Sequence, residues 1–139
     1  MSGLRANATC VSIWGRGLLI EGPSGSGKSN LALGLIDRGA VLVGDDGVTL
    51  EARGNRLFAS PPPEIAGKLE IRNVGLVDLP TTEAPLALVV RLDQAAPRFI
   101  DEAEMLEVAA HTLPLVRLWP DAPALPLRAE WALRRYGLA

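Results

Sequence analysis

The stretch that decides the fold is residues 18–29, LLIEGPSGSGKS. Its first four residues, 18–21, form a short apolar run that predicts a buried strand. Residues 22–29 follow directly and match the pattern G-x-x-x-x-G-K-[ST] at every fixed position. Residues 30–38 then predict a helix, with Gly39 placed to cap its C-terminus. Because strand, glycine-rich loop and helix occur in the required order, the sequence predicts a phosphate-binding loop rather than an ordinary glycine- and serine-rich turn.

Each part of this loop has a mechanical reason to bind phosphate. The glycines let the backbone wrap so that successive N–H groups point at phosphate oxygens, and the following helix adds the positive end of its dipole. Lys28 supplies a positive charge for the β and γ phosphates, and the Ser29 hydroxyl is suited to bind Mg²⁺. The expected ligand is a nucleoside triphosphate or something very like one. The predicted binding residues are Gly22, Pro23, Ser24, Gly25, Ser26, Gly27, Lys28 and Ser29.

Length and composition predict one soluble domain covering residues 1–139, since a chain of this size buries roughly two-thirds of its unfolded surface. Hydrophobic residues make up 48% and charged residues 22%, which is typical of a globular protein. The net charge of −2 argues against a general nucleic-acid-binding surface. The single cysteine, Cys10, excludes an internal disulfide and fits a reducing cytoplasm. No apolar run reaches the roughly 18 residues needed to span a membrane, and no apolar signal segment opens the chain.

The rest of the chain predicts mainly strands around the phosphate loop. A tight turn at residues 15–17 suggests that a strand at 8–14 forms a hairpin with the phosphate-loop strand. The apolar run at 40–43 is the expected next strand of a β–α–β unit, and the run at 86–92 is apolar enough for the centre of a sheet. Further predicted elements are a hairpin of strands 48–52 and 56–59, a strand or helix at 105–110, a strand at 113–118, irregular chain at 122–126 and a helix at 127–136.

Asp45 and Asp46 follow the predicted strand at 40–43 almost directly. That strand is expected to neighbour the phosphate-loop strand, and ligands of open α/β sheets bind at the carboxyl ends of the strands. Two adjacent carboxylates there could divide the work, since one can assist Mg²⁺ while the other accepts a proton from an attacking hydroxyl. The alternative is an Asp-Asp-Gly turn that only starts a hairpin.

Glu70 and Arg72 belong to a second unusual stretch, LEIRNVGL at residues 69–76. Alternation along a strand places both side chains on one side, away from Leu69 and Ile71. A carboxylate near Mg²⁺ and a guanidinium near the transferred oxygens are groups that phosphoryl transfer needs. The alternative is an exposed Glu/Arg pair with no role in chemistry.

Residues 9–79 resemble the catalytic domain of HPr kinase/phosphorylase, the bifunctional enzyme of the phosphotransferase system. Three segments carry the resemblance: GPSGSGKS at 22–29, IDRGAVLVGDD at 36–46, and LEIRNVGLV at 69–77, which is similar to the family signature LEIRGxG. The resemblance implies an α/β fold with the P-loop (Walker A) nucleotide-binding core of the HPr kinase/PEP carboxykinase-like type, a mixed central sheet with flanking helices. It also implies an ATP-dependent protein serine kinase, with an associated phosphorylase activity, that acts on HPr or an HPr-like phosphocarrier. A homo-oligomer, a hexamer, is expected by resemblance alone.

By position, the resemblance gives most candidate residues a role. Residues 22–29 would hold the phosphates of ATP, with Lys28 as a catalytic cation. Ser29 and Glu70 would bind Mg²⁺. Asp46, the second carboxylate of the pair, would accept the proton when a serine of the partner attacks ATP. The same group would donate a proton when phosphate or pyrophosphate chemistry runs the other way.

Other positions complete the comparison with the family or depart from it. The signature stretch at 69–78, which includes Arg72, would serve both reactions, and a family arginine in the following loop corresponds best to Arg98. The family has a histidine before the first strand where this chain has Asn7, which can form a hydrogen bond but cannot take a proton. Asn73 replaces the family glycine after LEIR and tolerates positive φ better than most residues. The separate N-terminal domain of longer members has no counterpart here, so a compact kinase core is expected.

Three functions stay open on the sequence alone. The first is the protein serine kinase, and the second is a small-metabolite kinase with the same loop, which would need an arginine-rich lid. The third is a nucleotide-sensing module that is catalytically weak because Asn7 replaces the histidine. Arg128, Arg134 and Arg135 are expected to form a solvated face, or else a docking or subunit surface.

Overall fold

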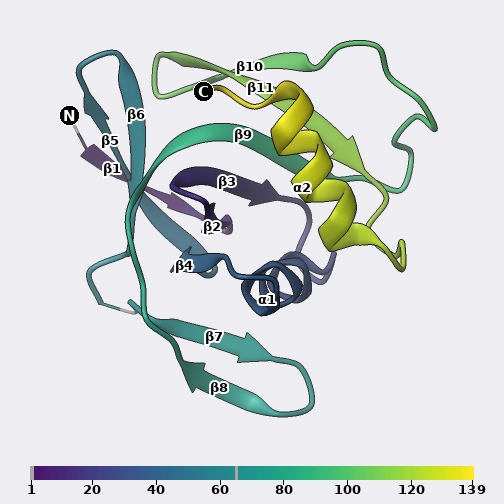
Figure 1. Ribbon diagram of the computed structural model, residues 1–139. Coiled ribbons are helices and arrows are strands. Elements are labelled where there is room, and N and C mark those ends of the chain that lie inside the picture. The colour runs from purple at the N-terminus through teal and green to yellow at the C-terminus, as the bar shows by residue number, and fades with distance from the viewer. Residues whose placement is uncertain (1, 65) are drawn as a thin grey trace.

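The computed structural model describes residues 2–64 and 66–139. Its helices are α1 (Lys28–Asp37) and α2 (Leu125–Tyr136). Its strands are β1 (Ser2–Ala6), β2 (Thr9–Ile13), β3 (Arg16–Glu21), β4 (Val41–Gly44), β5 (Gly47–Arg53), β6 (Arg56–Ser60), β7 (Lys68–Ile71), β8 (Gly75–Asp78), β9 (Ala84–Leu92), β10 (Glu104–Val108) and β11 (His111–Leu118). The main sheet has the order β1-β5-β6-β9-β3-β2-β4, with β11 joined to β9 and β10 joined to β11. Figure 1 shows this mixed sheet curving around the molecule, with α1 and α2 on one side of it.

The centre of the sheet is built from β3 and β9, whose apolar sequences predict this position. β3 pairs parallel with β9 and antiparallel with β2. Because side chains alternate along a strand, Leu18 and Ile20 join the apolar cluster under the helices, which includes Leu31 of α1. Leu19 joins a second cluster on the opposite face together with Leu86. The strand that leads into the phosphate loop is therefore buried on both faces and rigidly placed.

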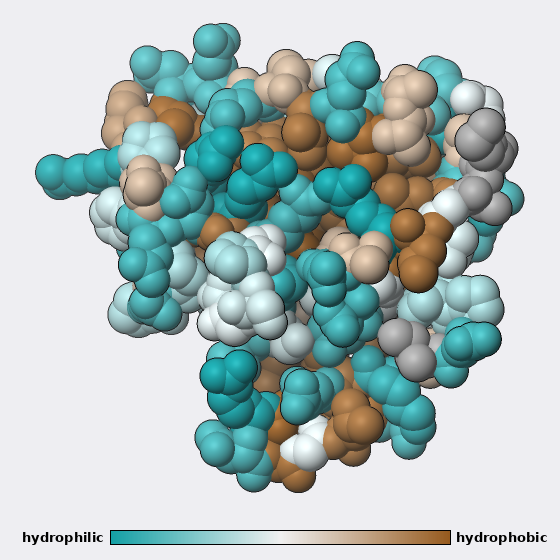
Figure 2. Space-filling view, turned by 180° about the vertical axis from the view of Figure 1, so that it is seen from behind, coloured by the Kyte–Doolittle hydropathy of each residue, from teal (hydrophilic) through white to brown (hydrophobic). Residues whose placement is uncertain are grey.

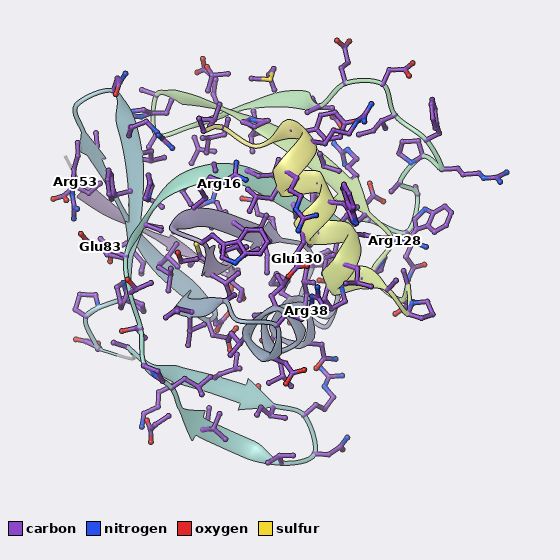
Figure 3. All side chains as sticks on the ribbon, in the orientation of Figure 1. Arg16, Arg38, Arg53, Glu83, Arg128 and Glu130 are labelled. Carbon is purple, nitrogen blue, oxygen red and sulfur yellow. The ribbon has the colours of Figure 1, made fainter. Side chains whose placement is uncertain are left out.

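α1 and α2 contact each other closely, which fixes the helix that begins at the phosphate loop. A Cβ atom on Gly34 of α1 would lie 2.6 Å from Cγ of Pro126, so only glycine allows this approach. Arg38 Nε, just after α1, donates a hydrogen bond of 3.0 Å to Glu130 Oε1 on α2. Figure 3 shows these two side chains between the helices. Glu130 is buried, so Arg38 supplies the counter-charge that burial requires.

The hairpin of β7 and β8 projects from the body of the molecule, as Figure 1 shows. Leu69 is its anchor, since this side chain is fully buried. Val74 and Leu76 are 72% and 71% exposed. Figure 2 shows apolar surface on this projecting lobe. Asn73, in the turn, has φ of +71°, a positive value that asparagine tolerates better than most residues.

The fold class and most elements are confirmed, but strand order differs from the expectation near the phosphate loop. β4 does not neighbour β3, because β2 lies between them and pairs antiparallel with both. The first strand, β1, was not predicted at all; it pairs antiparallel with β5. Both differences arise from contacts between distant segments, which local patterns do not encode.

Three local expectations are also refined. Arg72 lies in the turn between β7 and β8 and not on a strand, so it does not alternate with Glu70. Of residues 105–110, the first four belong to strand β10, whose pairing with β11 satisfies their backbone groups, and residues 109–110 form the turn that follows. α2 begins at Leu125 and includes Pro126 in its first turn, where a missing N–H costs nothing. Neither helix of the described chain is long and apolar enough to cross a membrane.

Candidate active site

The phosphate loop turns tightly between the end of β3 and the start of α1. The Ser26 N–H donates to the Pro23 carbonyl at 3.0 Å, and the Leu31 N–H donates to the Gly27 carbonyl at 2.9 Å. Gly25 and Gly27 adopt φ angles of +80° and +101°, which side chains disfavour. The N–H groups of the first turn of a helix have no partner within that helix, so they face the loop as donors. This arrangement suits a bound anion.

Lys28 folds back over the loop. Its Nζ atom donates to the Gly22 carbonyl at 2.8 Å and to the Pro23 carbonyl at 3.1 Å. An ammonium group carries three protons, so one proton remains for a ligand after both bonds are made. The positive charge is thus held next to the loop before any phosphate arrives.

Asp45 links three elements around the loop. Ser29 Oγ donates to Asp45 Oδ1 at 2.8 Å, and Thr9 Oγ1 donates to the same oxygen at 2.9 Å. The Glu70 N–H lies 3.4 Å from Asp45 Oδ2. Hydrogen bonds to a carboxylate are stronger than neutral ones, so Asp45 holds the start of α1 against β2 and β7.

A cavity of about 230 Å³ lies where these elements meet. Its walls come from the phosphate loop, the start of β2, the end of β4 and the β7–β8 hairpin. The lining residues are Thr9, Ser24, Gly25, Gly27, Lys28, Ser29, Asn30, Asp45, Asp46, Glu70 and Arg72. The structure therefore brings together candidates from three separate segments of the sequence.

Asn7 and Arg98 do not line this cavity. The Asn7 backbone N–H donates to the Asp46 carbonyl at 3.2 Å, and φ is +61° at Asn7 and +60° at Asp46. Asn7 thus supports the backbone of Asp46 from outside the cavity. Arg98 lines a different cavity beside α2, because the loop after β9 runs along β11 and is hydrogen-bonded there through Trp119. Arg98 therefore lies apart from the phosphate-loop cavity in this chain, and its correspondence to the family arginine stays a prediction.

The residues of the cavity fit Mg²⁺ and phosphate. Across residues 2–64 and 66–139, no group of three or more His, Cys, Asp and Glu side chains forms a ready metal cluster. Mg²⁺ does not require one, since it binds a few protein oxygens and completes its shell with phosphate and water. Ser29 and Glu70 supply oxygens of the right type at one cavity, and Asp45 lies beside them. Ser26 Oγ is buried without a hydrogen-bond partner in the described chain, which leaves an unused polar atom inside the loop.

Thr9 is a residue of the cavity that sequence reasoning missed. Its hydroxyl holds Asp45 in place, and its backbone pairs with Ile20 in the β2–β3 hairpin. The hairpin itself was predicted, and drawing its register would have put a hydroxyl next to the phosphate loop. The sequence instead predicted that the strand labelled β4 lies next to the phosphate-loop strand, so the position of Thr9 was not considered.

Comparison with known proteins agrees with the geometry. A family model described as the HPr Serine kinase C-terminal domain matches residues 3–112. The chain belongs to this family. The matched range includes the phosphate loop, the Asp45–Asp46 pair and the β7–β8 hairpin, and these segments contribute to the cavity.

Several curated proteins of the family are similar to the chain. HPr kinase/phosphorylase of Clostridium novyi is 34% identical over an alignment of 152 residues including gaps, which covers 96% of this chain and 49% of that protein. HPr kinase/phosphorylase of Mycoplasmopsis pulmonis is 41% identical over 76 residues, covering 55% of this chain and 25% of that protein. The matched region thus spans about a quarter to a half of the length of these two relatives.

A solved structure extends the likeness to the three-dimensional fold. The Hpr(Ser) kinase/phosphatase from Coxiella burnetii has a TM-score of 0.83 and 28% sequence identity. The alignment covers 95% of this chain and 88% of that chain. The HPr kinase fold is therefore present over nearly the whole chain, which is more than the range 3–112 that the family model matches.

Proposed function

We propose that this chain transfers the γ-phosphoryl group of ATP to a serine hydroxyl of HPr or an HPr-like phosphocarrier. The observation that carries the proposal is the single cavity lined by Lys28, Ser29 and the Asp45–Asp46 pair. Membership of the HPr kinase family supplies the expected acceptor. Homo-oligomeric assembly, as a hexamer, belongs to the same proposal.

The phosphate loop and Lys28 bind and orient the triphosphate. Backbone N–H groups at the start of α1 donate to phosphate oxygens, and the helix dipole favours their negative charge. Lys28 uses its remaining proton for the β and γ phosphates and neutralises charge that develops during transfer. Arg72, which lines the same cavity from the hairpin turn, provides a second cation.

Ser29 and Glu70 would hold Mg²⁺, in agreement with their oxygens on the cavity wall. When bound, Mg²⁺ neutralises the β and γ phosphate oxygens and orients the γ-phosphoryl group. Asp45 orients Ser29 through the hydrogen bond of 2.8 Å. Asp45 thus acts as a positioning residue in this proposal, because it holds the hydroxyl of Ser29 in place.

Asp46 is the proposed proton acceptor. Asp45 Oδ1 already accepts two hydrogen bonds, whereas the exposed Asp46 lines the cavity next to it. As the serine oxygen bonds to the γ phosphorus and the bond to ADP breaks, the hydroxyl proton passes to Asp46. In the phosphorylase reaction, an oxygen of inorganic phosphate bonds to the phosphorus of the phosphoserine as its bond to the serine oxygen breaks. Pyrophosphate leaves, and Asp46 returns a proton to the serine oxygen.

The decisive experiment is Mg²⁺-dependent transfer from γ-labelled ATP to purified HPr-type proteins, read as phosphoserine by mass spectrometry. Ser29→Ala is expected to abolish transfer, and Asp46→Asn is expected to slow it by about 10²–10⁴-fold. Thr112→Ala is the matched control, because it also removes a hydroxyl, from an exposed position on β11. It should leave transfer unchanged. Full activity in Asp46→Asn would remove Asp46 from its role.

The nucleotide-sensing alternative is distinguished by binding without turnover. If ATP binds tightly and no carrier is phosphorylated, the chain is a sensor, and Asn7→His tests the cause. Restored transfer in that variant would identify the missing imidazole as the limiting group. Unchanged absence of transfer would exclude the kinase proposal.

A further inference from the structure

A second cavity, of about 520 Å³, lies between α2, the end of β11 and the loop at residues 96–100. It shares no lining residue with the cavity at the phosphate loop. Its volume falls within the range of about 300–1,000 Å³ that is typical of small-molecule sites. The proposed phosphoryl transfer makes no use of it, so its lining needs an explanation of its own.

The walls of this cavity carry positive charge without a matching negative charge. Four arginines line it, Arg98, Arg117, Arg128 and Arg135, and none of its lining residues is acidic. Arg117 is neutralised, because it pairs with Asp93 at 3.0 Å and with Glu104 at 2.7 Å. Within residues 2–64 and 66–139, the other three form no ion pair with a carboxylate. Since the whole chain has a net charge of −2, this concentration of cations is local and favours an anion.

Aromatic rings contact two of these arginines. The Arg128 guanidinium lies 5.6 Å from the centre of the Trp119 ring, and the Arg135 guanidinium lies 5.8 Å from that of Tyr136. Figure 3 marks Arg128 on the side of α2 that faces this region. Phe99 and Trp131 also line the cavity and are 77% and 63% exposed. Large apolar side chains exposed next to a hollow are characteristic of ligand sites.

Hydrogen bonds build the cavity in advance of any ligand. Trp119 Nε1 donates to the Ala96 carbonyl at 2.6 Å, and the Tyr136 hydroxyl donates to the Ile100 carbonyl at 3.3 Å. The Asp93 N–H donates to the Leu118 carbonyl at 2.9 Å. These bonds attach the loop to β11 and to α2, so a ligand would not have to order the loop on binding.

We propose that this cavity binds a small organic anion with an aromatic or apolar body. The body would pack against Trp119, Trp131 and Phe99, and the anionic group would bind Arg128 and Arg135, whose planar guanidinium groups suit carboxylate, sulfonate or phosphate oxygens. The site is independent of the proposed kinase activity, because its residues lie outside the phosphate-loop cavity.

The test uses two dyes that differ in charge: 1-anilinonaphthalene-8-sulfonate, and N-phenyl-1-naphthylamine, which has the same rings without the sulfonate. Fluorescence titration of the full chain is expected to show one site for the sulfonate dye, at least tenfold tighter than for the neutral dye. Arg128→Gln and Arg135→Gln should each weaken sulfonate binding about tenfold, because each removes a charged partner. Both side chains are exposed, so the variants should fold normally.

Arg134→Gln is the matched control, since it removes the same charge from the position of α2 just before Arg135, and Arg134 does not line the cavity. It should change binding less than twofold. Lys28→Ala and saturating ATP should also leave dye binding intact if the two sites are separate. Equal affinity for both dyes, several equivalent sites, or insensitivity to Arg128→Gln and Arg135→Gln would overturn the proposal.

Discussion

Ser29 Oγ donates a hydrogen bond of 2.8 Å to Asp45 Oδ1, which connects the first turn of α1 with the end of β4 across the intervening strand β2. Thr9, at the start of β2, donates to the same oxygen at 2.9 Å. The phosphate loop and the acidic pair are therefore held together by one carboxylate. This relationship makes Asp45 the first residue to test by mutation.

Asp45→Ala is expected to lower kcat/KM for MgATP by about 10–10²-fold, because Ser29 loses the acceptor that orients its hydroxyl. Asp45→Asn keeps an oxygen for Ser29 and should retain more activity than Asp45→Ala. Thr9→Val removes only one of the two donors and should have the smallest effect. Steady-state kinetics of the three variants gives the comparison; equal activity of Asp45→Ala and wild type would contradict it.

Glu21, the last residue before the phosphate loop, makes stability depend on pH. Burial alone would raise the pKa of Glu21, but hydrogen bonds from Arg91 at 2.8 Å and Arg5 at 2.9 Å outweigh it and lower the pKa below its ordinary value. A lowered carboxyl pKa stabilises the fold at pH values above the pKa of the unfolded chain, about 4.3, and this contribution is lost as pH falls toward the folded-state pKa.

Glu21→Gln should therefore reduce the free energy of unfolding by about 1–2 kcal/mol at pH 7, and by less at pH 3. Urea unfolding at both pH values measures the difference. Glu107→Gln, an exposed position on β10, is the control and should show little effect at either pH. A Glu21→Gln effect that grows toward acid pH would contradict the assignment.

Gly34→Ala tests the close approach of α1 and α2. In an isolated helix this substitution would stabilise by about 1 kcal/mol, but here the new Cβ would lie 2.6 Å from Pro126 Cγ. We expect net destabilisation of about 1–3 kcal/mol, measured by thermal or urea unfolding. In a Pro126→Ala background the clashing atom is gone, so Gly34→Ala should cost much less. Equal destabilisation by Gly34→Ala in both backgrounds would show that the contact with Pro126 is not its cause.

Arg38→Ala tests the ion pair between the two helices. Glu130 is buried and would lose its hydrogen-bond donor, so the variant should be destabilised by about 1–3 kcal/mol at neutral pH. Adding Glu130→Gln removes the uncompensated charge and should restore part of the stability. A double-mutant cycle from unfolding midpoints gives the coupling, and additive losses would show that the pair does not interact.

The phosphate-loop part of the site could be predicted because the residues that form it are neighbours in the sequence. The glycines of the phosphate loop, Lys28 and Ser29 are contiguous, and the alternation of Leu18, Leu19 and Ile20 marks a strand buried on both faces. Even the positive φ of Asn73 follows from one position in a turn motif. Resemblance to the HPr kinase family then extended this local pattern to the acidic pair and the signature hairpin.

Contacts between distant segments account for what was missed. Arg98 follows a predicted central strand, and only the attachment of its loop to β11 and α2 sends it to a separate cavity. Arg72 reaches the phosphate-loop cavity from a turn rather than from a strand, because the chain reverses after Ile71.

The sequence by itself determined the phosphate loop, the buried strand before it, the helix after it and the family. Only the tertiary structure decided that β2 lies between β3 and β4, that Thr9 donates a hydrogen bond to Asp45 there, and that Arg128 and Arg135 of α2 line a second cavity. The physical reason is that a loop motif is encoded by neighbouring residues. Strand order and cavities depend instead on which remote surfaces bury their apolar faces together.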